Sequence, residues 1–108
     1  MSIYDLYGFR VKDILEAKIF VEDRLGIQLE ASDSSYFGVK YTYRRIGSDE
    51  GFVLFENYEK VEQEFIEKEF PEYSVLLSVD EANVTDAKKY ERLLLVEDEI
   101  SLLRREDL

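Results

Sequence analysis

The sequence predicts an α+β domain in which two helices pack on one face of a single antiparallel or mixed sheet of about five strands. Two stretches place apolar residues at helical spacing, whereas several others show the period of two that strands have. Short turn-like connections join neighbouring strands, which favours antiparallel pairing. The chain has 108 residues and contains neither an internal repeat nor a linker. One domain over residues 1–108 is therefore expected.

The first predicted helix covers residues 11–25. Its apolar residues form one broad arc on a helical wheel, the arc that would face the core. Lys18 and Glu22 are expected to pair at the edge of this arc, because side chains four residues apart are neighbours on a helix. Gly26 follows, where a left-handed residue commonly ends a helix.

Strands are predicted next. Residues 27–31 and 36–45 alternate apolar and polar side chains, and the glycine-bounded stretch 47–51 is typical of a hairpin loop. Residues 51–58 are apolar on both faces, which predicts a central strand. Residues 59–72 fit either a helix or an edge strand and are left open.

The last part of the chain contains a strand, a helix and a strand. Residues 73–79 alternate clearly after Pro71, and residues 100–105 form a short apolar strand. The helix between them is expected to be capped by Asn83 or Thr85, since both residue types favour that position. Its expected buried residues are Ala87, Tyr90, Leu93 and Leu94.

The residue types that are missing from the sequence argue against an enzyme. The chain has no histidine and no cysteine, so the commonest general base and the best nucleophile are both missing. Phosphate-binding loops, nucleophile elbows and dinucleotide fingerprints are also missing. We therefore expect no catalytic residues, no metal site and no cofactor.

The charge points to the class of partner. With 14 basic and 25 acidic residues the net charge is −11, which attracts basic proteins and repels nucleic acids and anionic membranes. The N-terminal residues lack the pattern of a signal peptide, and no apolar run is long enough to span a membrane. A cytoplasmic protein that binds a basic protein is expected, whereas its oligomeric state is left open.

The best candidate contact segment is 59–72, where six glutamates surround apolar side chains. Charges steer and select a partner, while buried aromatic residues supply affinity. The alternative is an ordinary solvated element whose apolar side faces the core. The predicted partner-binding residues are Tyr36, Asp49, Glu50, Tyr58, Glu59, Glu62, Glu64, Phe65, Glu67 and Glu69.

A second functional class is a regulatory or single-stranded nucleic-acid binder that uses a tyrosine-bearing sheet, with Lys40, Arg44 and Arg45 near the phosphates. Tyr41 and Tyr43 are expected to lie mostly in the core. The strongly negative net charge weighs against this function.

Several stretches together resemble small bacterial immunity proteins of polymorphic-toxin systems, of the contact-dependent growth inhibition type. The stretches are residues 3–9, 25–27, 34–38, 57–58, 69–77 and 102–105, so the resemblance spans nearly the whole chain. Arg10 departs from the pattern, because a Ser or Thr cap would suit the first helix there.

The resemblance implies a cytoplasmic antidote that binds the toxic domain of a large secreted effector and blocks its active site. Such toxins are often nucleases, which are commonly basic because they hold nucleic acid. An acidic inhibitor would match that charge. The resemblance assigns no contact residue, because immunity proteins differ most at the surface that meets the toxin.

Overall fold

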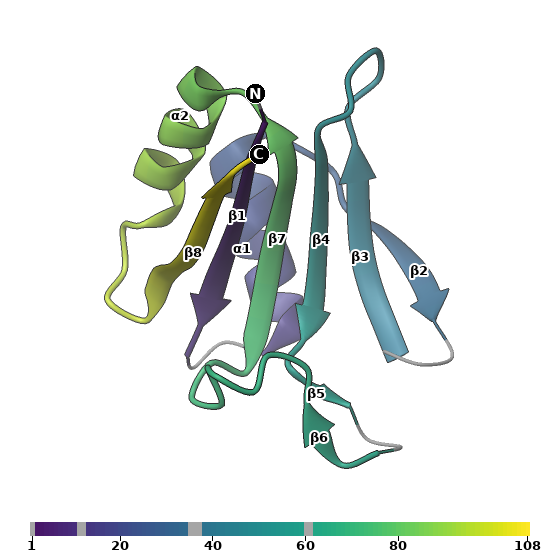
Figure 1. Cartoon of the computed structure of the whole chain (residues 1–108). Coiled ribbons are helices and arrows are strands. Elements are labelled where there is room, and N and C mark those ends of the chain that lie inside the picture. The colour runs from purple at the N-terminus through teal and green to yellow at the C-terminus, as the bar shows by residue number, and fades with distance from the viewer. Residues whose placement is uncertain (1, 11–12, 35–37, 60–61) are drawn as a thin grey trace.

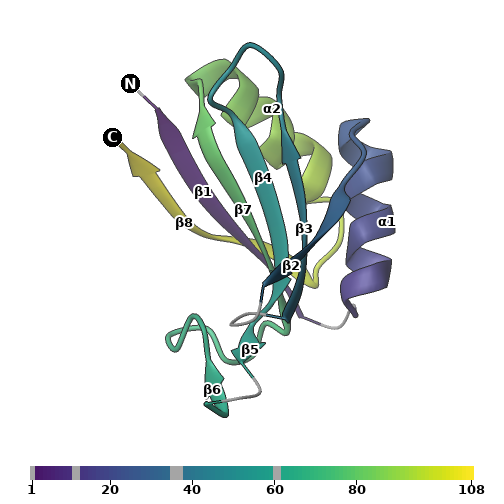
Figure 2. The same ribbon diagram turned by 90° about the vertical axis from the view of Figure 1, so that its right-hand side faces the viewer.

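The computed structural model describes residues 2–10, 13–34, 38–59 and 62–108, and it confirms the α+β prediction. Six strands pair antiparallel in the order β2-β3-β4-β7-β1-β8 (Figure 1). Both helices lie on one side of this sheet (Figure 2). The elements are β1 (Ile3–Phe9), α1 (Ile14–Leu25), β2 (Glu30–Ser34), β3 (Gly38–Arg44), β4 (Gly51–Glu56), β5 (Tyr58–Glu59), β6 (Glu64–Phe65), β7 (Val75–Ala82), α2 (Val84–Leu94) and β8 (Ile100–Asp107).

The strand missing from the sequence prediction is β1, which lies inside the sheet between β7 and β8. Its residues are buried on both faces, so it shows no clean alternation of apolar and polar side chains. It also contains Asp5 and Gly8, residue types that strands disfavour. Gly8 is needed because a Cβ there would lie 2.6 Å from Cδ1 of Tyr73.

Helix α1 begins at Ile14, after the expected start at residue 11. The cap is Asp13, whose side chain accepts the backbone N–H of Glu16 at 2.8 Å. The helix ends as predicted at Gly26, which has a φ of 67°. The predicted Lys18–Glu22 pair is confirmed, with Nζ and Oε1 3.1 Å apart.

The main core lies between the helices and the sheet. Ala17 and Val21 of α1 and Ala87, Tyr90 and Leu94 of α2 pack on the inward side chains of the strands. The cap of α2 is Asn83, one of the two predicted candidates, and its side chain accepts the N–H of Asp86. Leu93 is only half-buried, which differs from the prediction. No helix among the described residues is long and apolar enough to cross a membrane.

Between β4 and β7 the described residues 57–59 and 62–74 lie outside the main sheet and carry the small β5–β6 hairpin, whose conformation the sequence left open. We call them the 57–74 segment. Phe70 and Tyr73 of this segment pack with Leu6, Leu76 and Phe55 on the sheet face opposite the helices. The hairpin itself extends beyond one end of the sheet (Figures 1 and 2).

Buried Asn57 organises this segment. Its amide nitrogen donates to the carbonyls of Phe70 and Tyr73, at 2.9 and 3.0 Å, and its Oδ1 accepts the N–H of Glu67 at 2.8 Å. One side chain therefore satisfies three backbone groups of a stretch that has little secondary structure of its own.

Candidate protein-interaction surface

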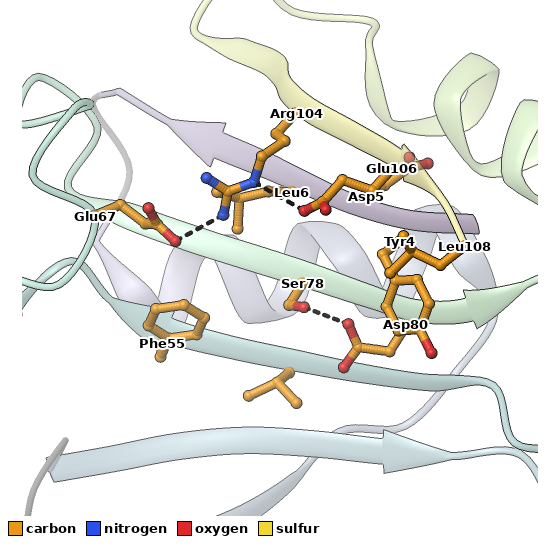
Figure 3. Close-up of a pocket in the computed structure, with 11 residues that line it drawn as sticks. Tyr4, Asp5, Leu6, Phe55, Glu67, Ser78, Asp80, Arg104, Glu106 and Leu108 are labelled. Carbon is orange, nitrogen blue, oxygen red and sulfur yellow. Dashed lines mark hydrogen bonds and ion pairs between the residues drawn. The ribbon is translucent and has the colours of Figure 1, made fainter. Parts of the chain in front are cut away.

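The sheet face opposite the helices is only partly covered, and it contains an open cavity of about 380 Å³ (Figure 3). We call it the open-face cavity. Strands β1, β4, β7 and β8 supply most of its lining, and the 57–74 segment closes one end through Glu67. The lining residues are Tyr4, Asp5, Leu6, Val53, Phe55, Glu67, Ser78, Asp80, Arg104, Glu106 and Leu108.

Strand register explains why these side chains meet. Leu6 lies opposite Ser78 on one side and opposite Arg104 on the other, and Ser78 lies opposite Val53. These neighbours share one face of the sheet, because directly opposed residues point the same way. The apolar floor continues into a smaller hollow of about 140 Å³ beside Lys40 and Ile66.

Arg104 contacts two acidic residues at one end of the cavity, Glu67 of the 57–74 segment and Glu106 of β8. Its Nη2 donates to Glu67 Oε1 at 2.8 Å, and its Nε lies 3.6 Å from Glu106 Oε1. The hydrogen bond to Glu67 raises the pKa of Arg104 above its ordinary value, and the negative charges of Glu67 and Glu106 add to the effect. This contact also ties the 57–74 segment to β8.

The other end of the cavity is acidic. The Ser78 hydroxyl donates to Asp80 Oδ1 at 2.7 Å, and the Tyr4 hydroxyl donates to Glu81 Oε1 at 3.0 Å. The hydrogen bond to Glu81 raises the pKa of Tyr4, and the charges of Glu81, Asp80 and Asp49 raise it further. Negative potential therefore gathers where Asp80 and Tyr4 stand side by side (Figure 3).

The backbone is strained beside this acidic end. Glu81 has a φ of 56°, in the left-handed region that residues other than glycine rarely adopt. It lies where the pairing of β1 with β7 shifts register between Ile3 and Asp5. Such irregularities redirect side chains, and here the Glu81 carboxylate is brought to the Tyr4 hydroxyl.

The predicted contact residues cluster in part on the 57–74 segment. Tyr58 and Phe65 are opposed in the β5–β6 hairpin, with ring centroids 5.4 Å apart at an interplanar angle of 75°. Both rings stay accessible, at 42% and 38% exposure. Glu62, Glu64 and Glu69 are exposed beside them, and Glu67 reaches the cavity.

Two of the predicted contact residues are buried, which corrects the prediction. Glu50 is 3% exposed because it lies beneath Tyr90, whose hydroxyl donates to Oε1 at 2.6 Å, with Arg45 3.6 Å away. Glu59 is 6% exposed and accepts the N–H of Glu62 within the hairpin. Both carboxylates make their contacts within the fold, so neither is available to a partner.

The remaining predicted residues do not join this cluster. Asp49 is exposed in the β3–β4 loop, at the end of the sheet opposite the hairpin (Figure 1). Tyr36 lies outside the described residues. Tyr41 and Tyr43 are half-buried and pack against the main core, as predicted, so their rings face the helix side of the sheet.

The sequence prediction did not include the cavity residues Ser78, Asp80 and Glu106. A signal for some of them was present, because Ser78 and Asp80 alternate with the buried Leu77 and Val79. That alternation marks the outward face of a strand. It does not tell which strands are neighbours, and β1 was not recognised as a strand at all.

Among the described residues, no group of three or more acidic side chains is placed to hold a metal ion. No protein-family model matches the sequence, and a search of curated proteins finds no match. The candidate site therefore rests on its geometry: an open acidic cavity, with an acidic and aromatic hairpin beside it.

Proposed function

We propose that this protein binds a basic protein through the open sheet face and the β5–β6 hairpin, and that it acts as an immunity protein for a toxin domain. The observation that carries the proposal is the position of the open-face cavity and the hairpin on the same side of the sheet. Together they provide a concave floor, exposed aromatic side chains and excess negative charge.

The composition of this surface suits protein recognition. Aromatic residues that stay partly exposed are typical anchors of protein interfaces, and Tyr58 and Phe65 make an edge-to-face contact with each other. The surrounding glutamates would accelerate encounter with a basic partner. A toxin that holds RNA or DNA is basic at its active site, so the same charges would compete with its substrate.

The alternative function, a nucleic-acid binder with a tyrosine platform, receives less support. Tyr41 and Tyr43 pack on the helix side, and Tyr4 is the tyrosine that lines the open-face cavity. The carboxylates of Asp80, Glu67 and Glu106 line the same cavity and would repel phosphates.

The test is co-expression with a candidate toxin domain, sought in the gene next to the one that encodes this protein. We expect the two chains to co-purify and the cells to survive. The association rate should fall as salt rises, because screening weakens electrostatic steering. Absence of both binding and protection would refute the proposal, and a gel shift of single-stranded RNA at low salt would favour the alternative.

A pair of variants tests the surface itself. Tyr58→Ala with Phe65→Ala removes the exposed rings of the hairpin and should weaken toxin binding by at least tenfold, mainly through faster dissociation. The matched control is Leu15→Ala with Ile19→Ala, which removes two exposed apolar side chains from α1 on the opposite side of the sheet. Equal effects of the two variants would show that the hairpin is not the contact.

A further inference from the structure

Asp80 is the carboxylate of the open-face cavity whose charge is left uncompensated. Asp5 is paired with Arg105, and Glu67 and Glu106 share Arg104. Within the described part of the chain, Asp80 has the Ser78 hydroxyl as its hydrogen-bond partner, on Oδ1, and no cation within ion-pair distance. A half-buried carboxylate with one neutral hydrogen-bond partner can still accept charge-assisted hydrogen bonds from a cation.

The residues around Asp80 offer the two kinds of surface that a long amphipathic side chain needs. Leu6 and Val53 are apolar lining residues of the cavity. Asp80 lies at its acidic end beside the Tyr4 ring (Figure 3). A side chain with an aliphatic stem and a cationic tip satisfies both surfaces at once. A planar guanidinium suits this end better than an ammonium, because it binds a carboxylate in a fork and also stacks on aromatic rings.

We propose that the open-face cavity receives one arginine side chain of the basic partner, with its guanidinium on Asp80 and its stem on Leu6 and Val53. This inference rests on the proposed function and deepens it, because it names the anchoring side chain and the residue that receives it. The exposed glutamates of the hairpin then steer the partner, whereas Asp80 holds it.

Titration of the ¹⁵N-labelled full chain with N-acetyl-arginine amide, followed by NMR at low salt, tests the cavity without the toxin. We expect amide shifts confined to residues 4–6, 78–80 and 104–106, and none with the neutral isostere N-acetyl-citrulline amide. Asp80→Asn should weaken binding about tenfold, as the loss of a charge-assisted hydrogen bond predicts. Asp23→Asn removes the same charge from the exposed surface of α1 and should leave the affinity unchanged.

Equal shifts with the neutral compound, shifts scattered over the acidic surface, or an unchanged affinity in Asp80→Asn would overturn the inference. Cavity resonances that depend on protein concentration without the probe would also overturn it, since they would mean that a second copy occupies the cavity. If Asp80→Asn fails to fold, Ser78→Leu fills the same space and must give the same loss.

The two proposals fail separately. A chain that binds the blocked arginine in the cavity but does not bind the neighbouring toxin would refute the immunity function alone. A chain whose affinity for the toxin is unaffected by both Asp80→Asn and Ser78→Leu would refute the arginine site and leave the immunity function standing.

Discussion

Two buried tyrosines show how differently one residue type can serve this fold. The Tyr90 hydroxyl donates to the buried Glu50 carboxylate, whereas the Tyr7 hydroxyl is buried without a hydrogen-bond partner among the described residues. A buried hydroxyl that is hydrogen-bonded stabilises the folded state, whereas one without a partner destabilises it. Replacing tyrosine by phenylalanine should therefore change the free energy of unfolding differently at the two positions.

We expect Tyr90→Phe to lower the free energy of unfolding by about 1–3 kcal/mol, because it removes a hydrogen bond to a buried charge. Tyr7→Phe should be neutral or stabilising. Urea unfolding at pH 7 measures both, each variant serving as the control for the other. Equal losses would mean that the Tyr7 hydroxyl has a partner after all.

Alkaline stability depends on the same two side chains. Burial raises the pKa of Tyr7 and, together with the Glu50 hydrogen bond, that of Tyr90. The folded protein therefore retains protons that the unfolded chain loses above about pH 10, so stability should fall as the pH rises beyond that value. In Tyr7→Phe this fall should be shallower, which urea unfolding at pH 9 and 11 would measure; an unchanged slope would contradict the assignment.

Helix α1 is joined to the start of β2 by one glutamate. Glu22 Oε2 accepts the N–H of Leu29 at 2.8 Å, while Oε1 pairs with Lys18. The bond from Leu29 lowers the pKa of Glu22, and the Lys18 contact lowers it further. This stabilisation is present above the unfolded pKa, near 4.3, and is lost as the pH falls through the lower folded pKa.

Glu22→Gln should cost roughly 0.5–1 kcal/mol at neutral pH and reduce the loss of stability between about pH 4.5 and 3. Urea midpoints measured across that range check it. Glu16→Gln is the matched control on the same helix. The Glu16 side chain is exposed, and its hydrogen bond to Asp13 is made by the backbone N–H, which the substitution leaves in place. If Glu22→Gln loses as much stability as the parent protein over this pH range, Glu22 is not the titrating group.

The 57–74 segment depends on Asn57 more than on its own short strands. Asn57→Ala leaves the carbonyls of Phe70 and Tyr73 and the N–H of Glu67 without their side-chain partner. We expect a loss of about 2–4 kcal/mol and faster amide exchange at Ile66 and Phe70, with the rest of the sheet still protected. Gln28→Ala, an exposed control, should change neither measurement; uniform loss of protection would argue against a local role.

The molecule has a net charge of −11, and it measures 37 × 29 × 28 Å along its principal axes. At about 0.01 M salt the Debye length is about 30 Å, so the excess negative charge repels itself across the whole molecule, whereas at about 0.1 M the Debye length is about 10 Å and this repulsion is screened. Salt should therefore raise the urea midpoint of the free protein while slowing its association with a basic partner. A midpoint that falls with salt would mean that surface ion pairs outweigh the repulsion.

Much of this architecture follows from local sequence. The two helices, the end of α1 at Gly26 and a choice of two caps for α2 were predictable, because periodicity and caps depend on neighbours in the chain. The strands predicted at 51–58 and 73–79 correspond to β4 and β7, but β4 ends at Glu56 and β7 covers Val75–Ala82. The predicted class, two helices on one face of a sheet, is confirmed. The composition alone already indicated an acidic chain without histidine or cysteine.

Tertiary structure decided the rest. Strand β1 was missed because both of its faces are buried, and Asp5 is tolerated there through its bidentate pair with Arg105, 100 residues away. The sequence suggests that Glu50 and Glu59 are surface residues, yet both are buried in the fold. Glu50 is hydrogen-bonded to Tyr90, 40 residues away, and Glu59 to the backbone of Glu62 in the hairpin. The open-face cavity joins residues from both ends of the chain, and only strand order and register bring those side chains together.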